Sequence, residues 1–369
     1  MAHPPAPLHF GAISYPIYQT ATFAHPGVGQ STGYDYTRQQ NPTRDELERV
    51  VRDLEHGTDA LAFATGMAAA GALMELFSPG DHIVASEDLY GGSIRLFAHI
   101  NRKNGISVTH VDTGDIAAVE GALGPDTRAI FVETPTNPMM HVTDIRKVAD
   151  LAHSRGLLLI VDNTFMTPIF QTPLTLGADV VLHSGTKYLG GHNDTLSGFL
   201  VVKSPELSEK LRFIFKTTGA GLAPFDSWLI LRGLKTLDLR VRRQEQNALA
   251  VATWLKAQPK VTKVFYPGLP EHPGYAVSKA QCHGFGAMIS FLVDSEETAK
   301  SVLNRVRLIR FAESLGGVES LITYPLTQTH ADLSPAEREH RGISGLLLRF
   351  SAGIEAAGDL LADLAQALG

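Results

Sequence analysis

Between about residue 58 and residue 202, the chain alternates short apolar runs with amphipathic stretches. This alternation is typical of repeated β-strand–α-helix units. We expect strands there at residues 60–64, 81–86, 129–133, 157–162, 180–183 and 198–202, and helices at 66–77 and 145–155. The run 157–161 is apolar at every position, which predicts a strand covered by helices on both faces.

The pattern changes after residue 202. A long helix is expected at about 226–257, joining the first part of the chain to the rest, followed by strands near 286–292 and 346–351 and helices near 296–306 and 356–367. At 369 residues, the chain is about twice the usual size of one domain. The sequence therefore predicts an α/β protein with a mostly parallel sheet in a large domain, residues 43–235, and a smaller α+β domain, residues 236–369.

Composition narrows the class of protein. Hydrophobic residues make up 44% of the chain and charged residues 19%, which is the balance of a globular enzyme rather than of a disordered protein. The net charge of −6 argues against a nucleic-acid groove, which needs a clustered basic surface. Basic residues do gather at 232–243, where we expect a solvated helix face.

The cysteine count, the apolar runs and the first residues indicate where in the cell the protein is expected. The single cysteine, Cys282, excludes a disulfide framework and a cysteine-based metal cage, and no metal site is expected. The longest unbroken aliphatic run, 157–161, is far too short to cross a bilayer. The first residues have neither the basic residues nor the apolar stretch of a signal peptide. We expect a soluble protein of the cytoplasm.

Two strand ends carry the first candidate chemistry. Asp162 directly follows the apolar run, and a buried carboxylate there needs a partner, because an unpaired buried charge is costly; a helix N-cap or a structural arginine would also satisfy it. Lys187 follows the strand that ends at His183. Most such lysines are only solvated, but burial or nearby charge turns a lysine into a nucleophile. Together the two residues match pyridoxal phosphate (PLP), which requires a lysine for its aldehyde and an acid for its ring nitrogen.

PLP also carries a phosphate, for which the sequence offers a third element. Gly66 and Met67 begin an alanine-rich helix directly after the predicted strand 60–64, and the free N–H groups at a helix start favour an anion. Ser184 and Thr186, close to Lys187, offer hydroxyl groups. A glycine turn between strand and helix is common and has little weight alone. Three elements that match the aldehyde, ring nitrogen and phosphate of one molecule make PLP the expected cofactor.

Seven segments resemble the Cys/Met-metabolism (trans-sulfuration) family of fold-type-I PLP-dependent enzymes, and the resemblance covers essentially the whole chain. They are YDYTRQQNPTR at 34–44, EDLYGGSIR at 87–95, ETPTNP at 133–138, VDNTF at 161–165, SGTKYLGGHND at 184–194, ESLGGVES at 313–320 and LRFSAGIE at 348–355. Together they are highly specific to the family, whereas the last is weak alone. The resemblance implies a transferase or lyase of sulfur amino-acid metabolism.

The resemblance also implies a role for each cofactor residue. Lys187 would carry PLP as a Schiff base and move protons between substrate carbons, Asp162 would pair with the ring nitrogen, and Tyr90 would stack on the ring and assist catalysis. The phosphate would be held by Gly66, Met67, Ser184 and Thr186.

A Tyr-x-Arg motif implies that two subunits share each site. Tyr36 and Arg38 match the motif that reaches the phosphate of the neighbouring subunit, so residues 1–42 are expected to form an N-terminal arm. The resemblance therefore implies a homodimer at minimum, and we expect a homotetramer made of two dimers. The expected partners are otherwise small-molecule amino-acid substrates, with neither nucleic acid nor a membrane.

The substrate residues implied by the resemblance favour reaction at the γ-carbon. Ser314 and Arg349 match the groups that bind the α-carboxylate, for which an arginine fork is well suited, and Asn137 matches the asparagine near the ring oxygen of the cofactor and the substrate carboxylate. Glu313 matches a residue of cystathionine γ-synthases and γ-lyases, where typical β-lyases carry an apolar or aromatic residue.

Two further positions match those assigned to the distal end of the substrate in γ-synthases, Asp35 and Arg95, although Arg95 also fits an ordinary helix surface. The expected reaction is replacement of the acyl group of O-acetyl- or O-succinylhomoserine by cysteine, giving cystathionine.

Other reactions and classes remain open at this point. γ-Elimination or β-elimination of cystathionine, and replacement with sulfide, would use most of the same residues. A PLP-binding protein without activity should have lost Lys187, Tyr90 or Arg349, and all three are present. A dinucleotide-binding fold is disfavoured because the nearest glycine motif, GAGLAP at 219–224, lacks the last glycine. Gly185 replaces the alanine or cysteine usual in the family, which predicts slightly looser packing.

Overall fold

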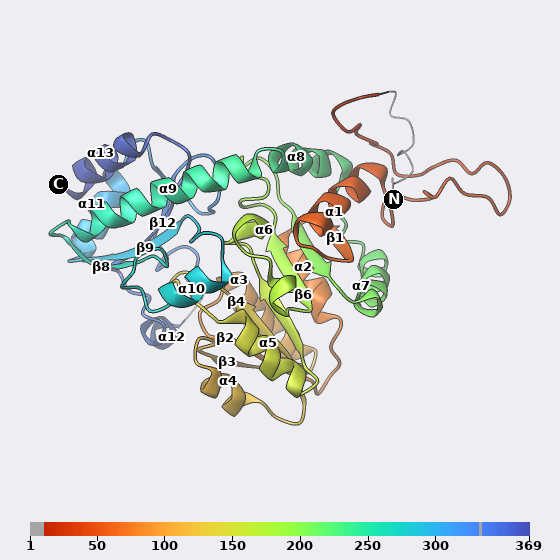
Figure 1. The fold of residues 1–369 in the computed structure, drawn as a ribbon, viewed down its shortest axis with the longest axis horizontal. Coiled ribbons are helices and arrows are strands. Elements are labelled where there is room, and N and C mark those ends of the chain that lie inside the picture. Colours follow the sequence, from red (N-terminus) through yellow and green to blue (C-terminus); the bar gives the residue numbers. More distant parts are fainter. Residues whose placement is uncertain (1–10, 332–333) are drawn as a thin grey trace.

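The computed structural model describes residues 11–331 and 334–369, so the first ten residues of the predicted arm lie outside the described part. Two sheets organise the chain, one within residues 59–202 and the other within residues 261–351. Figure 1 shows the long helix α9 (Leu237–Lys256) running from the first part of the molecule along the second. The predicted boundaries at residues 42 and 235 stay a prediction.

The first sheet has seven strands in the order β1-β7-β6-β5-β4-β2-β3. Their bounds are β1 (Asp59–Phe63), β2 (His82–Ser86), β3 (Ser107–Val111), β4 (Thr127–Glu133), β5 (Leu158–Asp162), β6 (Val180–Ser184) and β7 (Gly198–Val202). β7 is antiparallel to both of its neighbours, and the four other pairings are parallel. The expectation of a mostly parallel sheet is confirmed, and β3, which was not predicted, forms its partly exposed edge.

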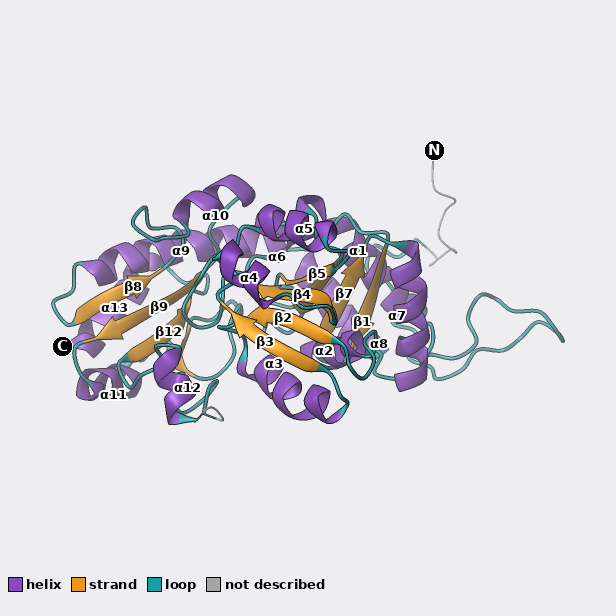
Figure 2. Ribbon diagram, turned by 90° about the horizontal axis from the view of Figure 1, so that it is seen from below, coloured by secondary structure: helices purple, strands orange, loops and turns teal. Residues whose placement is uncertain are grey.

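Helices cover both faces of this sheet, with α5 on one side and α2 on the other (Figure 2). The helices of this part are α1 (Pro42–Leu54), α2 (Gly66–Met74), α3 (Gly91–Arg95), α4 (Ile116–Ala122), α5 (Ile145–Ser154), α6 (Thr167–Phe170), α7 (Pro205–Thr218) and α8 (Pro224–Leu234). Side-chain caps define several starts: Asn41 accepts from the N–H of Thr43, and Thr65 accepts from that of Ala68. β5 is buried at every residue after Leu158, as its apolar run predicts.

The second sheet has five strands in the order β10-β11-β12-β9-β8. Its strands are β8 (Val261–Phe265), β9 (Met288–Val293), β10 (Arg310–Phe311), β11 (Leu321–Thr323) and β12 (Leu347–Ser351). The helices around it, after α9, are α10 (Tyr275–Gln281), α11 (Glu296–Arg305), α12 (Pro335–His340) and α13 (Ala357–Leu368). The predicted strands 286–292 and 346–351 correspond to β9 and β12, which pair with each other inside the sheet. The α/β class with a smaller second α+β part is confirmed.

The single long helix expected at 226–257 is wrong, because the structure has two helices, α8 and α9, that meet at Lys235 and Thr236. The guanidinium of Arg240 lies at this junction and donates to the carbonyl oxygens of Tyr188 at 2.8 Å and Gly233 at 2.9 Å. Arg240 is therefore buried, and burial lowers its pKa to about 10. The expected solvated face holds for Arg232, Lys235 and Arg242, but not for Arg240.

Packing at Gly185 also differs from the expectation. A Cβ atom at this position would lie 2.3 Å from both Cε2 of Phe199 and Oγ of Ser197. The space of the missing side chain is therefore already filled, and Gly185 lets β6 and β7 approach closely rather than loosening the core.

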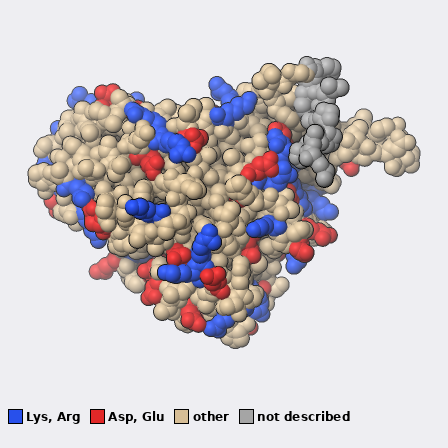
Figure 3. All heavy atoms as spheres, viewed as in Figure 1, with Lys and Arg blue, Asp and Glu red and all other residues tan. Residues whose placement is uncertain are grey.

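The charge of the surface, the length of the helices and the grouping of possible metal ligands are relevant to the expected absence of nucleic-acid, membrane and metal partners. Acidic and basic residues are interspersed over the face seen in Figure 3, without one extended basic area. In the part of the chain that the structure describes, no helix is long and apolar enough to span a bilayer. The same residues contain no group of three histidine, cysteine or acidic side chains placed to hold a metal ion.

Candidate active site

A cavity of about 330 Å³ lies where the carboxyl ends of β4, β5 and β6 face the second sheet. Ligands of open α/β sheets bind at this edge. Predicted site residues from Gly66 to Arg349 meet here, although they come from both parts of the chain. The predicted residues that line the cavity are Gly66, Met67, Tyr90, Asn137, Asp162, Ser184, Thr186, Lys187, Glu313, Ser314 and Arg349. Their roles stay predictions, but their convergence in one cavity is a property of the structure.

Lys187 lies in the turn after β6, with its side chain in the cavity. Its Nζ donates to Oγ of Ser314 at 2.9 Å. Burial, together with the charge of Arg349, lowers the pKa of Lys187 to about 8, and the charge of Glu313 opposes the shift. A substantial fraction of this amine is therefore neutral in mildly basic solution, as a lysine nucleophile requires.

Asp162 ends β5 and is held by the side chain that follows it in the VDNTF segment. Its Oδ1 accepts from the backbone N–H of Thr164 at 3.0 Å and from its hydroxyl at 2.6 Å. Thr164 Oγ1 in turn accepts from the N–H of Ser184 at 2.8 Å. Burial raises the pKa of Asp162, and the Thr164 hydrogen bonds oppose that rise. Thr164 thus links the acid to the strand end before Lys187, and the sequence reasoning missed it.

The start of α2 lines the part of the cavity where the phosphate is predicted to bind. Thr65 caps the helix by accepting from the N–H of Ala68, and Gly66 and Met67 line the cavity. A Cβ atom at residue 66 would lie 3.0 Å from Cβ of Ser184. The glycine therefore lets the helix start lie beside the hydroxyl-bearing turn, so that N–H groups and hydroxyls are available to one anion.

Arg349 of β12 supplies a cation to the cavity. It is 2% exposed, and it donates to Oδ1 of Asn137 at 2.9 Å, to the carbonyl oxygen of Ser314 at 3.0 Å and to Oγ1 of Thr323 at 3.2 Å. Among the described residues its Nε has no partner. Burial lowers the pKa of Arg349 to about 10. Since its carboxylate neighbours do not neutralise it directly, the guanidinium is available to an incoming carboxylate.

Glu133 is a second site residue that the sequence reasoning left without a role. It ends β4, lines the cavity, and accepts from the backbone N–H of Tyr90 at 2.9 Å. Burial raises the pKa of Glu133 well above its ordinary value, and the charge of Asp162 raises it further. Glu133 therefore anchors the backbone that presents Tyr90 to the cavity. A carboxylate at the end of an apolar strand, as for Asp162, is the pattern that would have revealed it.

Four predicted residues lie outside the cavity of this chain. Arg38 donates to the carbonyl oxygen of Lys216 and stacks on the ring of Tyr36, with 5.6 Å from Cζ to the ring centroid. Asp35 accepts from the hydroxyl of Ser31 at 2.7 Å. Arg95 is exposed at the end of α3. Arg38, Tyr36 and Asp35 lie on the N-terminal arm. Their contribution to the active site of a neighbouring subunit stays a prediction.

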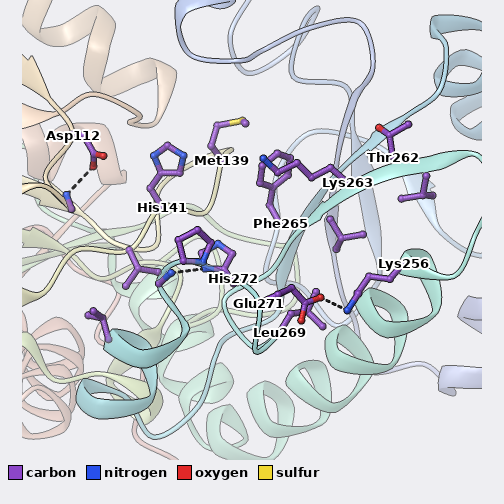
Figure 4. Close-up of a pocket in the computed structure, with 17 residues that line it drawn as sticks. Asp112, Met139, His141, Lys256, Thr262, Lys263, Phe265, Leu269, Glu271 and His272 are labelled. Atoms are coloured by element: carbon purple, nitrogen blue, oxygen red, sulfur yellow. Dashed lines mark hydrogen bonds and ion pairs between the residues drawn. The ribbon is translucent and has the colours of Figure 1, made fainter.

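A larger groove, of about 760 Å³, lies elsewhere, between β8, α10 and the loops that follow β3 and β4 (Figure 4). His141, His272 and Lys263 are among the residues around it, and Lys256 pairs with Glu271 at its edge. It contains none of the predicted cofactor or substrate residues. Size therefore does not identify the active site here; the combination of Lys187, Asp162 and a helix start does.

The fold and the cavity together define a PLP-dependent enzyme of the α/β class. The buried acid, the lysine with a lowered pKa and the glycine-lined helix start fit the ring nitrogen, aldehyde and phosphate of the cofactor. The chain belongs to the Cys/Met metabolism PLP-dependent enzyme family, whose model matches residues 3–369. The family resemblance and the PLP cofactor inferred from the sequence are confirmed.

Relatives and solved structures agree on the family and differ in reaction. The chain is 51% identical to cystathionine gamma-lyase of Bacillus subtilis over 97% of this chain and 94% of the relative. It is 49% identical to cystathionine gamma-synthase of Haemophilus influenzae over 97% of this chain and 93% of the relative. It superimposes on cystathionine gamma synthase of Xanthomonas oryzae in complex with cystathionine with a TM-score of 0.96, at 42% identity, covering 98% of this chain and 94% of that one. The chain is thus a PLP-dependent trans-sulfuration enzyme with amino-acid substrates.

Proposed function

We propose that the enzyme catalyses γ-replacement: the acyl group of an O-acylated homoserine leaves, and the thiol of cysteine adds at the γ-carbon, giving cystathionine. The observation that carries the proposal is the position of Glu313. Its side chain is exposed and lines the cavity, one residue before Ser314, which contacts Lys187. A carboxylate at the opening can bind the ammonium group of a second amino acid, as an incoming cysteine requires.

When bound, PLP supplies an electron sink for the bonds broken at the α-carbon of the substrate. Lys187 moves protons between the α- and β-carbons, for which its lowered pKa suits it, because the amine both accepts and returns a proton near neutral pH. The hydroxyl of Ser314 holds Nζ in place at 2.9 Å. Tyr90 lies at the cavity wall with its backbone anchored by Glu133, and assists proton transfer over the ring.

Arg349 and Asn137 hold the α-carboxylate of the substrate. The guanidinium is oriented by three hydrogen bonds before the substrate arrives, so little side-chain freedom is lost on binding. A fixed carboxylate orients the bond at the α-carbon relative to the ring of the cofactor, which is what the electron sink requires.

The tail of the acyl substrate would be read at the opening. Glu313 provides a negative charge there, and we propose that Asp35, from the arm of a neighbouring subunit, adds a second negative charge and Arg95 a positive one. The cations among the residues that line the cavity are Lys187 and Arg349. The choice between an acetyl and a succinyl group therefore depends on whether a cation such as Arg95 reaches the opening in the assembled enzyme.

γ-Elimination of cystathionine is the second candidate, and the 51% identity to a cystathionine gamma-lyase favours it. β-Elimination and replacement with sulfide are further alternatives within the family, since relatives at 45% to 48% identity include β-lyases and an O-acetylhomoserine thiol-lyase. A protein that binds PLP without turnover is the alternative of another class. These reactions use the same residues inside the cavity, so that they are distinguished only by the products formed from each substrate.

A side-by-side assay tests the proposal. One series contains O-acetyl- or O-succinylhomoserine with cysteine or sulfide, and the other contains cystathionine alone, with release of 2-oxo acid measured. Cystathionine formation at the higher kcat/KM supports γ-replacement. Dominant 2-oxobutyrate from cystathionine would establish γ-elimination, dominant pyruvate β-elimination, and efficient use of sulfide a sulfhydrylase.

The Glu313→Gln variant tests the observation itself. We expect it to raise the KM for cysteine with little change in kcat, because it removes charge at the opening and leaves the reacting groups in place. Glu319→Gln is a matched control, because Glu319 is also exposed but is not among the residues that line the cavity. If Glu313→Gln and Glu319→Gln have equal KM values for cysteine, Glu313 does not bind the incoming amino acid and no longer supports γ-replacement.

We further propose that the enzyme works in the cytoplasm as a homodimer at minimum, and as a homotetramer formed from two dimers. Support for the dimer comes from the arm, because Tyr36, Arg38 and Asp35 lie away from the cavity of their own chain. Sedimentation velocity of the holoenzyme at assay concentrations distinguishes the monomer, dimer and tetramer.

A further inference from the structure

A buried polar network lies on the face of the large sheet opposite the cavity. Leu182 and Ser184 of β6 line the cavity, and so does Asp162 of β5. Because side chains alternate along a strand, the residues next to them, His183 and Asn163, point to the other face. Both are fully buried there, at 0% exposure. They directly adjoin two cofactor-binding positions in the sequence.

Glu55, the residue that follows α1, contacts both of these side chains. Its Oε1 accepts from Nε2 of His183 at 2.6 Å and from Nδ2 of Asn163 at 2.9 Å. The side chain of Glu55 is 0% exposed. Such a short contact between a ring nitrogen and a carboxylate is typical of a charge-assisted hydrogen bond. One buried carboxylate thus joins the ends of β5 and β6.

Gln171 completes the network and orients Asn163. Nδ2 of Asn163 also donates to the carbonyl oxygen of Gln171 at 2.8 Å, and Nε2 of Gln171 donates to Oδ1 of Asn163 at 2.9 Å. Both polar atoms of the Asn163 amide are therefore engaged. The position of Asn163, and with it the backbone that follows Asp162, is determined by groups outside the cavity.

We propose that Glu55 is a positioning residue for the cofactor: through its hydrogen bonds to Asn163 and His183 it fixes the strand ends that carry Asp162 and Ser184. An acid that holds a protonated ring nitrogen has to be ionised. Burial opposes ionisation of Asp162 by raising its pKa, and the charge of His183 lowers that pKa. Oε1 of Glu55 fixes the orientation of the His183 ring through Nε2 at 2.6 Å. This holds whichever trans-sulfuration reaction the enzyme catalyses.

The Glu55→Gln variant separates this role from simple support of the core, because it keeps the shape and one acceptor oxygen but removes the charge. Glu355→Gln is the matched control. Glu355 accepts from the N–H of Ser320 at 2.6 Å and from its hydroxyl at 2.8 Å, and it lies outside the cavity lining. Three quantities are compared in both variants and the wild type: the visible absorption spectrum of the holoenzyme, the Kd of PLP for the apoenzyme, and the Tm.

We expect Glu55→Gln to change the visible spectrum and to weaken PLP binding roughly tenfold, the order expected when one buried charged hydrogen bond is lost. Glu355→Gln should lower the Tm without either change. If Glu55→Gln lowers the Tm and leaves the spectrum and the Kd of PLP unchanged, Glu55 only supports the fold and the proposal is overturned. If that variant does not fold, His183→Gln, which retains an amide donor towards Glu55, is measured instead, and an unchanged spectrum and Kd overturn the proposal in the same way.

Discussion

Nζ of Lys187 donates a hydrogen bond to Oγ of Ser314 at 2.9 Å, across 127 residues of sequence. Lys187 follows β6 of the large sheet, whereas Ser314 lies between β10 and β11 of the second sheet. Ser314 has a φ of 91°, in the region that favours glycine. A side chain held in such a backbone conformation indicates a functional constraint. The two parts of the chain therefore complete one site only when they are packed together.

Replacing Lys187 with alanine is expected to abolish turnover and to leave the fold intact, because the phosphate end and the core do not depend on the amine. Circular dichroism and activity measurements check both parts. In the wild type, borohydride should fix the cofactor covalently to Lys187, as peptide mass spectrometry would show. Lys216→Ala is the control. A colourless wild-type protein that gains no visible band with added PLP would contradict the assignment.

The pH dependence of the apoenzyme's stability follows from the same lysine. The pKa of Lys187 is lowered from 10.5 to about 8 in the folded protein, so between these values the unfolded chain binds more protons than the folded one. Stability should therefore rise with pH across this window, by roughly 3 kcal/mol at most. The free energy of unfolding of the wild type minus that of Lys187→Met, measured from pH 7 to about pH 10.5, should show this slope. A flat difference would contradict it.

Replacing Arg349 with lysine should reduce kcat/KM by roughly a hundredfold, because an ammonium group cannot maintain the three oriented contacts and also bind a carboxylate with two parallel hydrogen bonds. Steady-state kinetics with the acyl substrate measure the loss, which should appear in KM. Arg310→Lys, at an exposed position of β10, serves as the control. Unchanged kinetics in Arg349→Lys would mean that the carboxylate binds elsewhere.

Mixing two inactive variants tests the shared site. Lys187→Ala lacks the amine, and Arg38→Ala lacks the proposed contact with the neighbouring subunit's phosphate. If subunits exchange, a hybrid dimer contains one site with both residues, so that activity should reappear on mixing. The measurement is activity against time after mixing. Full activity in a protein shown to be monomeric under assay conditions would rule out the shared site.

Gly185→Ala should destabilise the protein by about 1–3 kcal/mol, the usual cost of overpacking, because the new Cβ would lie 2.3 Å from Phe199 and Ser197. Phe199→Leu in the same chain should recover part of the loss by vacating space. Thermal or urea unfolding of the single and double variants measures the coupling. If the two effects simply add, the close contact does not determine the residue at position 185.

The sequence alone was sufficient for the central elements. The strands β4, β5 and β6 were predicted to within a few residues, because a strand covered on both faces needs an unbroken apolar run, and such a run is visible locally. β3 was missed for the converse reason: it lies at an edge, is partly exposed, and mixes polar and apolar residues. The break between α8 and α9 is also absent from the local pattern, since Arg240 beside the break bonds to the carbonyl oxygen of Tyr188, which comes from a distant segment of the chain.

The site shows the same division. Motifs around Asp162, Lys187 and Arg349 identify the chemistry, because PLP requires particular residue types at strand ends and helix starts. Only the tertiary structure shows that Glu133 holds the backbone of Tyr90 and that Glu55 contacts His183, 128 residues away. Residue type and spacing determine which reactive groups are present, whereas burial and contacts between distant segments determine their orientation and protonation, and these depend on how the whole chain packs.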